Sequence, residues 1–87
     1  MKSQQDVEAI ESGVISCLLH DWSRVKDLCD EFFITVHFFS NQDNRMAFAC
    51  AIQGIYPQDW NEYAEFLPNA DNARYYIEEL RSLVHSP

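Results

Sequence analysis

Apolar residues in the first third of the chain recur at intervals of three and four, which is the spacing of one face of an α-helix. Two stripes follow one another, made of Val7, Ile10, Val14, Cys17 and Leu18 and then of Trp22, Val25, Leu28, Cys29 and Phe32. Ser3 is suited to cap the first helix, while Gly13 inside it costs about 1 kcal/mol relative to alanine. Since Asp21 and Ser23 can each cap a new helix, we expect a break near residues 20–23.

The middle of the chain supports two interpretations. Residues 33–39 are rich in β-branched and aromatic side chains, as in a strand, and residues 46–52 could pair with them in a hairpin. The intervening loop, however, lacks the glycine of favoured hairpin turns. In the helical interpretation, Asp43 caps a helix over residues 44–53, and Gly54 stands where a C-terminal glycine belongs.

The last third of the chain predicts two more helices. Pro57 suits the first turn of one, whose shared face holds Trp60, Tyr63, Ala64 and Leu67. Pro68 ends it, and Asn69 or Asp71 starts the last helix. The apolar stripe of that last helix is Ala73, Tyr76, Ile77, Leu80, Leu83 and Val84. We therefore expect an all-α fold, a compact bundle of four to five short helices. The alternative is an α+β fold with helices packed on a β-hairpin at about residues 33–52.

Composition and charge narrow the classes of function. The chain has 87 residues, enough for one domain spanning residues 1–87, and 47% of them are hydrophobic, as in a globular protein. The formal net charge is −8, and the six lysines and arginines are scattered. Because nucleic acids and anionic membranes are bound through clustered cations, we expect neither as a partner. An acidic surface favours a protein partner with a basic surface.

The cysteines and the apolar runs indicate in which cellular compartment we expect the protein. Cys17, Cys29 and Cys50 are odd in number and lie among apolar neighbours, which favours reduced core thiols in a cytoplasmic protein. Residues 1–12 show no apolar run typical of a signal peptide. The apolar runs at residues 32–39 and 46–52 are too short to cross a bilayer.

Acidic residues gather in the last third of the chain. Residues 46–73 contain four acids and no lysine or arginine. Three of these acids recur at three-residue spacing and form an edge beside two aromatic residues, giving the candidate partner-binding set Asp59, Trp60, Glu62, Tyr63 and Glu65. Tryptophan and tyrosine are common interface anchors, so this edge predicts a docking face. The alternative is a solvated helix face that keeps the protein soluble, with its aromatic neighbours in the core.

The segment at residues 33–39 suggests self-association. As a strand or as a helix it carries more apolar surface than one small core readily covers, and a homodimer would bury the excess. The candidate dimer interface is Phe33, Ile34, His37 and Phe38. The alternative is a central element packed on all sides.

Candidate chemistry is sparse. Cys17 and His20 are three residues apart, but structural zinc sites need a second tight pair of ligands, which the sequence lacks. Cys50 and His37 are the only pair that a hairpin could bring together, and the apolar neighbours of Cys50 disfavour a reactive thiolate. We therefore expect no enzyme, catalytic residue, metal or cofactor. The sequence predicts a small acidic protein-binding module, of the kind that inhibits a partner by covering its basic site. The alternative is a small homodimeric domain that binds an apolar ligand among its aromatic residues.

Overall fold

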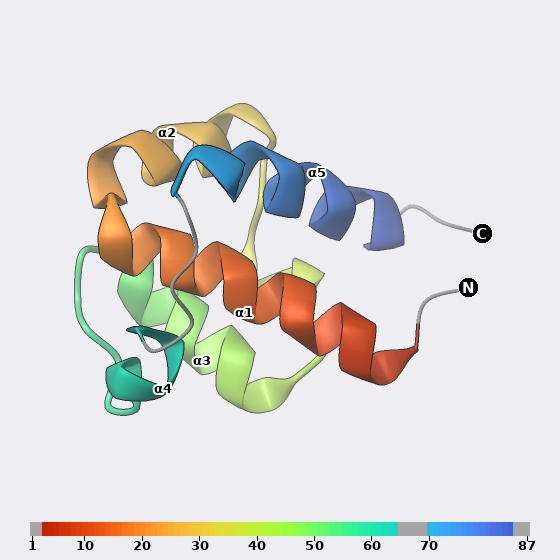
Figure 1. The fold of residues 1–87 in the computed structure, drawn as a ribbon, viewed down its shortest axis with the longest axis horizontal. Helices are drawn as coiled ribbons and strands as arrows, with labels where there is room; N and C mark the ends of the chain where they lie inside the picture. The colour runs from red at the N-terminus through yellow and green to blue at the C-terminus, as the bar shows by residue number, and fades with distance from the viewer. Residues whose placement is uncertain (1–2, 65–69, 85–87) are drawn as a thin grey trace.

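The computed structural model describes residues 3–64 and 70–84 and folds them into helices (Figure 1). The α-helices of this part are α1 (Gln4–His20), α2 (Trp22–Glu31), α3 (Gln42–Ala51), α4 (Trp60–Ala64) and α5 (Ala73–Val84). Two single-turn 3₁₀ helices lie at Val36–Phe38 and Ala70–Asn72. No strand occurs among the described residues, so the all-α prediction is confirmed and the hairpin alternative is wrong.

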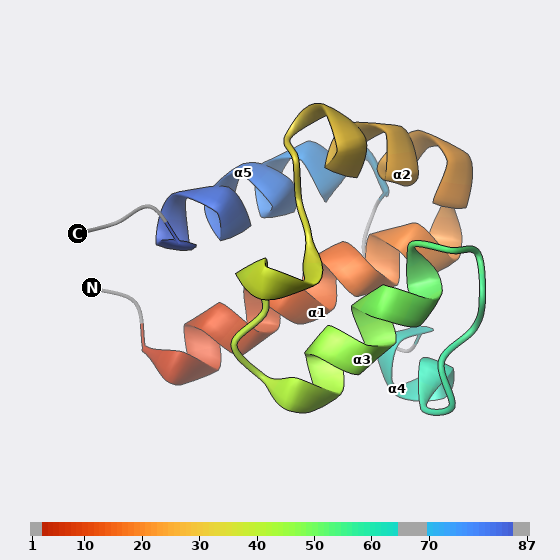
Figure 2. The same ribbon diagram turned by 180° about the vertical axis from the view of Figure 1, so that it is seen from behind.

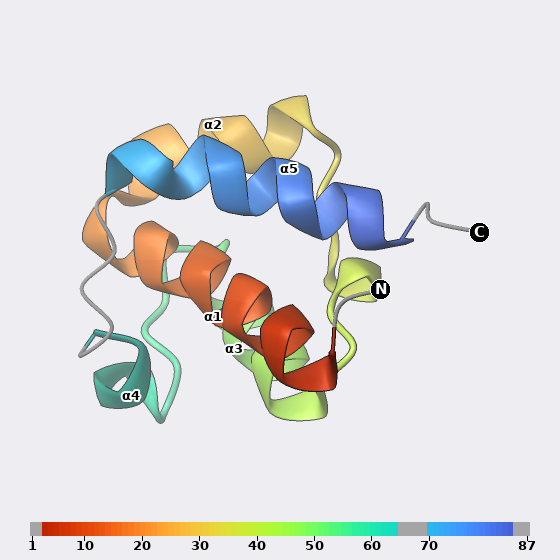
Figure 3. The ribbon, with the colours of Figure 1, turned by 45° about the vertical axis from the view of Figure 1, so that its right-hand side comes forward.

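The long helix α1 lies at the centre and packs against all four other α-helices. Helices α2 and α5 cover one side of it and α3 and α4 the other, as Figures 1 and 3 show. The core is built from the apolar stripes of these helices: Ile10, Val14, Ile15, Cys17, Leu18, Val25, Cys29, Ala47, Phe48, Ala51, Ala73, Ile77 and Leu80. The stripes that the sequence predicts for α1, α2 and α5 therefore face the core in large part, whereas Trp22 of the α2 stripe is 40% exposed and the side chain of Val84 lies outside the described part.

The predicted boundaries of α1 are confirmed. The Ser3 hydroxyl accepts a hydrogen bond from the Asp6 N–H (3.2 Å), so Ser3 is the N-cap. The chain breaks at Asp21, between α1 and α2. The Asp21 side chain does not cap α2; it pairs instead with Arg24 (3.2 Å).

Gly13 explains the close approach of α1 and α5. A Cβ atom on this glycine would lie 2.7 Å from the ring of Tyr76, closer than such contacts occur in proteins. The expectation that glycine destabilises the helix relative to alanine holds only for the isolated helix. In the fold, an alanine at this position would collide with α5.

The segment after α2 is neither a strand nor a continued helix. The N–H of Phe33 donates to Asp30 O (3.2 Å) and that of Ile34 to Cys29 O (2.9 Å), with Phe33 at a φ of 56°. This is a Schellman motif, which ends a helix with one left-handed residue, usually glycine. The chain then crosses the face of α1 that is turned towards the viewer in Figure 2, and reaches α3 after the 3₁₀ turn.

Helix α3 starts two residues earlier than the sequence predicts. Its N-cap is Asn41, whose side-chain oxygen accepts from the Asn44 N–H (3.1 Å), while Asp43 lies in the first turn. At the other end Gly54 has a φ of 78°, and its N–H donates to Ala51 O (3.0 Å). The glycine stop is therefore confirmed, and the Asp43 cap is wrong because the amide of Asn41 takes that role.

The last third differs in detail from the prediction. Pro57 precedes α4, and its carbonyl accepts from the Trp60 N–H (3.1 Å), so it is not in the first turn of the helix. Leu67, Pro68 and Asn69 lie outside the described residues. Helix α5 begins at Ala73 after a 3₁₀ turn that contains Asp71. In the described part of the chain, no helix combines the length and the apolar character needed to span a membrane.

Candidate functional site: an acidic cleft and an apolar pocket beside α4

Buried hydrogen bonds fix the short helix α4 to its neighbours. Tyr63, on α4, is buried, and its hydroxyl donates to the side-chain oxygen of Asn44 on α3 (2.6 Å). The Ser16 hydroxyl on α1 donates to the backbone carbonyl of Tyr63. A helix of five residues has little stability of its own, so these contacts hold it in place.

Glu11 fixes the start of α3 in the same way. Its side chain is fully buried (0% exposed), and its carboxylate accepts from the Ser40 N–H (2.8 Å), the Ser40 hydroxyl (2.7 Å), the Asn41 N–H (3.3 Å) and the Asn44 amide (3.1 Å). Hydrogen bonds to a carboxylate are stronger than neutral ones, and the positive end of α3 favours the negative charge. The buried charge is thus stabilised by four donors.

The sequence analysis assigned no role to Glu11, although its position in the hydrophobic pattern of α1 indicates burial. Glu11 is four residues after Val7, three before Val14 and seven before Leu18, so it falls on the apolar stripe of α1. A carboxylate at a core position needs hydrogen-bond donors around it. The polar run at residues 40–44 supplies them.

Four carboxylates line a hollow between α1, α3 and α4. The hollow has a volume of about 320 Å³ and is lined by Gln5, Glu8, Ala9, Ser12, Asn41, Asp43, Asn44, Asp59, Glu62 and Tyr63. We call it the acidic cleft, after its carboxylates Glu8, Asp43, Asp59 and Glu62. A second hollow, lined by Asp43, Met46, Gln58, Asp59 and Glu62, continues it across α3. Among the described residues that line the two hollows there is no lysine or arginine.

The negative charges of the cleft affect the pKa of Tyr63. Burial, with smaller contributions from the negative charges of Asp59, Glu62, Asp43 and Glu11, raises the pKa of its hydroxyl to about 12. The hydroxyl therefore stays protonated and remains a donor to Asn44. Of these charges, those of Asp59, Glu62 and Asp43 also line the cleft and make it attractive to cations.

The structure assigns different places to the five residues of the predicted partner-binding set. Trp60 and Glu62 are exposed, Trp60 at 42%, and Asp59 is half-buried. Tyr63 is only 6% exposed, which removes it from the predicted docking face, because it is the residue that packs α4 onto α1 and α3. Glu65 lies outside the described residues.

The residues of the predicted dimer interface differ in exposure. Phe33 is 75% exposed and His37 is also exposed, while Phe38 is half-buried. Ile34 belongs to the core, because its N–H and side chain close the end of α2. Of the predicted set, Ile34 is therefore not available to a second copy.

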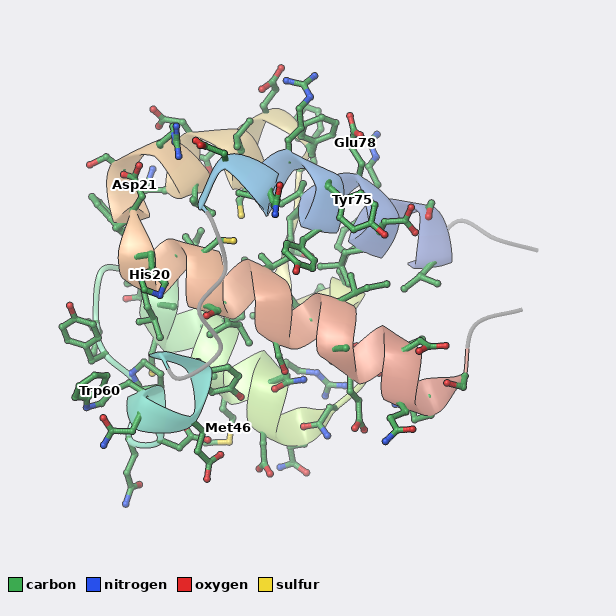
Figure 4. All side chains as sticks on the ribbon, in the orientation of Figure 1. His20, Asp21, Met46, Trp60, Tyr75 and Glu78 are labelled. Carbon is green, nitrogen blue, oxygen red and sulfur yellow. The ribbon has the colours of Figure 1, made fainter. Side chains whose placement is uncertain are left out.

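An apolar pocket lies beyond α4, at the other end of α3. Its volume is about 280 Å³, and it is lined by Leu18, Leu19, Trp22, Ala51, Gly54, Ile55 and Tyr56. The rings of Tyr56 and Trp60 are 5.5 Å apart and connect this pocket to α4. In Figure 4, Trp60 and Met46 lie around α4, whereas Tyr75 and Glu78 lie on α5 across the molecule. Sequence analysis missed the pocket because its two walls are about thirty residues apart in the chain.

The thiols are placed for packing. Cys17 and Cys29 are fully buried, and burial raises the pKa of Cys17 to about 11 and that of Cys29 to about 12. Thiols of such high pKa are poor nucleophiles and poor metal ligands at neutral pH. Within residues 3–64 and 70–84, no group of three or more histidine, cysteine, aspartate and glutamate side chains is placed to hold a metal ion.

Comparisons with protein-family models, with curated proteins and with solved structures give no match for this chain. The candidate site is defined by its own geometry, as two features at the two ends of α3. The acidic cleft contributes Asp59, the apolar pocket contributes Tyr56, and Trp60 lies between them.

Proposed function

We propose that this chain is a small acidic protein-binding module that covers a basic site on a partner protein through its acidic cleft. One observation carries the proposal: carboxylates from three separate helical regions converge on one hollow, and no lysine or arginine among the described residues lines it. Most acidic surfaces of small proteins are interspersed with cations. Here we expect the positive charge that balances these carboxylates to come from a partner.

The arrangement is costly for the protein alone. Like charges that face one cleft repel each other, and the repulsion is strongest where low-dielectric walls limit screening. Lysine or arginine side chains of a partner would relieve this repulsion on binding. Charges of this kind also accelerate encounter with an oppositely charged partner, and the acceleration falls as salt is added.

The surroundings of the cleft suit a protein partner. Trp60 is partly exposed beside Asp59, and Met46, 62% exposed, lines the continuation of the cleft. Aromatic residues and methionine are enriched in protein interfaces, where they supply apolar contact area. A partner whose basic site is covered in this way would be blocked from its own anionic ligand, which is how the module would act as an inhibitor or antagonist.

The test compares two charge reversals of equal size. Glu62→Lys changes a cleft residue and Glu31→Lys changes an exposed acid at the end of α2, so both variants have the same net charge. Binding of a lysine-rich peptide is measured by isothermal titration at low and high salt. We expect Glu62→Lys to weaken binding at low salt about tenfold more than Glu31→Lys does. Equal effects of the two variants would show that only net charge matters and would contradict the proposal.

A second candidate function, self-association with an apolar ligand bound among the aromatic residues, is favoured by Phe33. This side chain is 75% exposed and occupies a left-handed backbone position that favours glycine. Light scattering on a sizing column tests it, across protein concentration and salt. A dimer that resists salt and is lost in Phe33→Ser would support this function, and a monomer throughout would remove it.

A further inference from the structure

The apolar pocket is bordered by side chains that a folded monomer leaves unusually exposed. Tyr56 is 65% exposed, Ile55 55% and Trp22 40%, and Trp60 lies next to them. Together with the buried side chains of Leu18 and Ala51 they surround a volume of about 280 Å³. A volume of this size accommodates one large side chain and is at the lower limit for a small-molecule ligand.

The walls of the pocket are held in position before anything binds. The indole N–H of Trp22 donates to Ile52 O (3.3 Å). Gly54, at a φ of 78°, and Ile55 are fixed by backbone hydrogen bonds to Ala51 O and Cys50 O, both 3.0 Å. A preformed pocket avoids the entropic cost of ordering side chains and loops during binding.

The residues that line the pocket carry no charge of either sign, so the pocket itself suits an apolar group. No lysine or arginine is among the residues that line it, and Trp60 joins it to Asp59 of the acidic cleft. Lys26 lies over the Trp22 ring at 5.9 Å, but its ammonium group is paired with the Asp30 carboxylate at 3.0 Å. The pocket and the cleft thus lie at the two ends of α3, apolar at the Ala51 end and negative at the Asp43 end, and Tyr56, Trp60 and Asp59 connect them.

We propose that this pocket receives one bulky apolar side chain of the basic partner, so that the recognised segment combines lysine or arginine residues with an aromatic or long aliphatic anchor. The inference rests on the proposed function and adds what the cleft alone does not give, which is the selection of one basic segment among many. Charge brings the partner to the surface, and the anchor determines which partner stays, because burial of an apolar side chain is not screened by salt.

The two tryptophans of the chain allow the pocket to be observed separately from the cleft. In the Trp60→Phe variant, Trp22 is the single tryptophan, and it lines the pocket. Two lysine-rich peptides, identical except for a central phenylalanine or alanine, are titrated into the unaltered protein to measure affinity and into this variant to follow fluorescence. We expect the phenylalanine peptide to bind about tenfold more tightly, because the side chain is buried on binding. We also expect the phenylalanine peptide, and not the alanine peptide, to shift the fluorescence emission of Trp22 to shorter wavelength.

A pair of tyrosine substitutions tests whether the preference for the phenylalanine peptide arises in the pocket. Tyr56→Ser removes part of the pocket rim, and Tyr75→Ser removes a tyrosine of similar exposure, 57%, on α5. Both side chains are exposed, so neither substitution should prevent folding. We expect the preference for the phenylalanine peptide to disappear in Tyr56→Ser and to persist in Tyr75→Ser. A preference that Tyr56→Ser leaves intact would overturn the assignment of the pocket.

The remaining outcomes separate this inference from the proposed function. If the two peptides bind equally, and Glu62→Lys weakens both, the anchor is wrong and the acidic docking face stands. If neither peptide binds the unaltered protein, the proposed function fails and the inference fails with it. If a phenylalanine peptide with serine in place of lysine binds as tightly as the lysine-rich one, the pocket is a site for apolar compounds, and the basic partner is excluded from it.

Discussion

The two sides of α1 are held by different forces. Towards α2 and α5 the contacts are apolar, and Gly13 lets the ring of Tyr76 lie directly against the helix backbone. Towards α3 and α4 the contacts include a polar network in which Glu11 and Tyr63 bond to Asn44. Apolar packing supplies stability without direction, whereas hydrogen bonds fix relative positions. The acidic cleft lies on the polar side, where fixed positions of its carboxylates matter most.

Replacement of Glu11 by glutamine tests the polar side and should have the largest effect. The amide cannot accept as strongly, and its NH₂ group would face the donors of residues 40 and 41. We expect a loss of roughly 3 kcal/mol in the free energy of unfolding, measured by urea denaturation. Glu8→Gln, which alters a carboxylate at the rim of the cleft, is the matched control and should cost less than about 1 kcal/mol. Equal losses would mean that the buried network does not hold α3.

Gly13→Ala tests the apolar side. Helix propensity alone predicts stabilisation of about 1 kcal/mol, but the added methyl group meets the Tyr76 ring at 2.7 Å. We expect a net loss of roughly 2 kcal/mol, since packed contacts tolerate little extra volume. Ala9→Gly, at an exposed position of the same helix, should lose about 1 kcal/mol through propensity. A more stable Gly13→Ala variant would contradict the close packing of α1 and α5.

Alkaline pH acts on the polar side through Tyr63. Its pKa is raised from 10 to about 12 in the folded protein. The unfolded chain therefore releases this proton first, so the stabilisation is complete below pH 10 and is lost as the pH rises towards 12. We expect Tyr63 to contribute roughly 2 kcal/mol to the loss of stability over this range. The Tyr63→Phe variant, followed by urea denaturation at each pH, should lose correspondingly less, and an unchanged pH dependence would contradict the burial of this hydroxyl.

The ends of α2 and α3 offer the smallest and most closely matched comparison. Phe33 and Gly54 occupy equivalent left-handed positions, with φ values of 56° and 78°. Phe33→Gly should raise the free energy of unfolding by roughly 0.5–1 kcal/mol, and Gly54→Ala should lower it by about 1 kcal/mol. Both are measured by thermal and urea unfolding. A loss of stability in Phe33→Gly would mean that the phenylalanine contributes packing that outweighs its backbone strain.

Much of the fold could be predicted from the sequence, because helical stripes are a local signal. The cap at Ser3, the break at Asp21 and the glycine stop at Gly54 follow from short-range chemistry. The end of α2 could not be predicted, because the Schellman motif carries phenylalanine where glycine is the usual signal. Composition around Phe33 favoured a strand, but no partner strand exists among the described residues.

The candidate site was predicted less completely than the fold. The spacing of Asp59 and Glu62 indicated an acidic edge, but Glu8 and Asp43 join it only through the packing of α1 and α3. Tyr63 was assigned to the surface because spacing within one helix cannot show what covers it. Contacts between distant segments decide burial, and the periodicity of one segment does not contain them.

The most direct test of the central claim is a map of amide chemical-shift changes by nuclear magnetic resonance during titration with a lysine-rich peptide. The account predicts that the largest changes occur at the cleft residues Glu8, Asp43, Asp59 and Glu62, and that the exposed acids of α2 change little. Changes of equal size at all exposed acids, or the largest changes on α2, would show that the acidic cleft is not a docking surface.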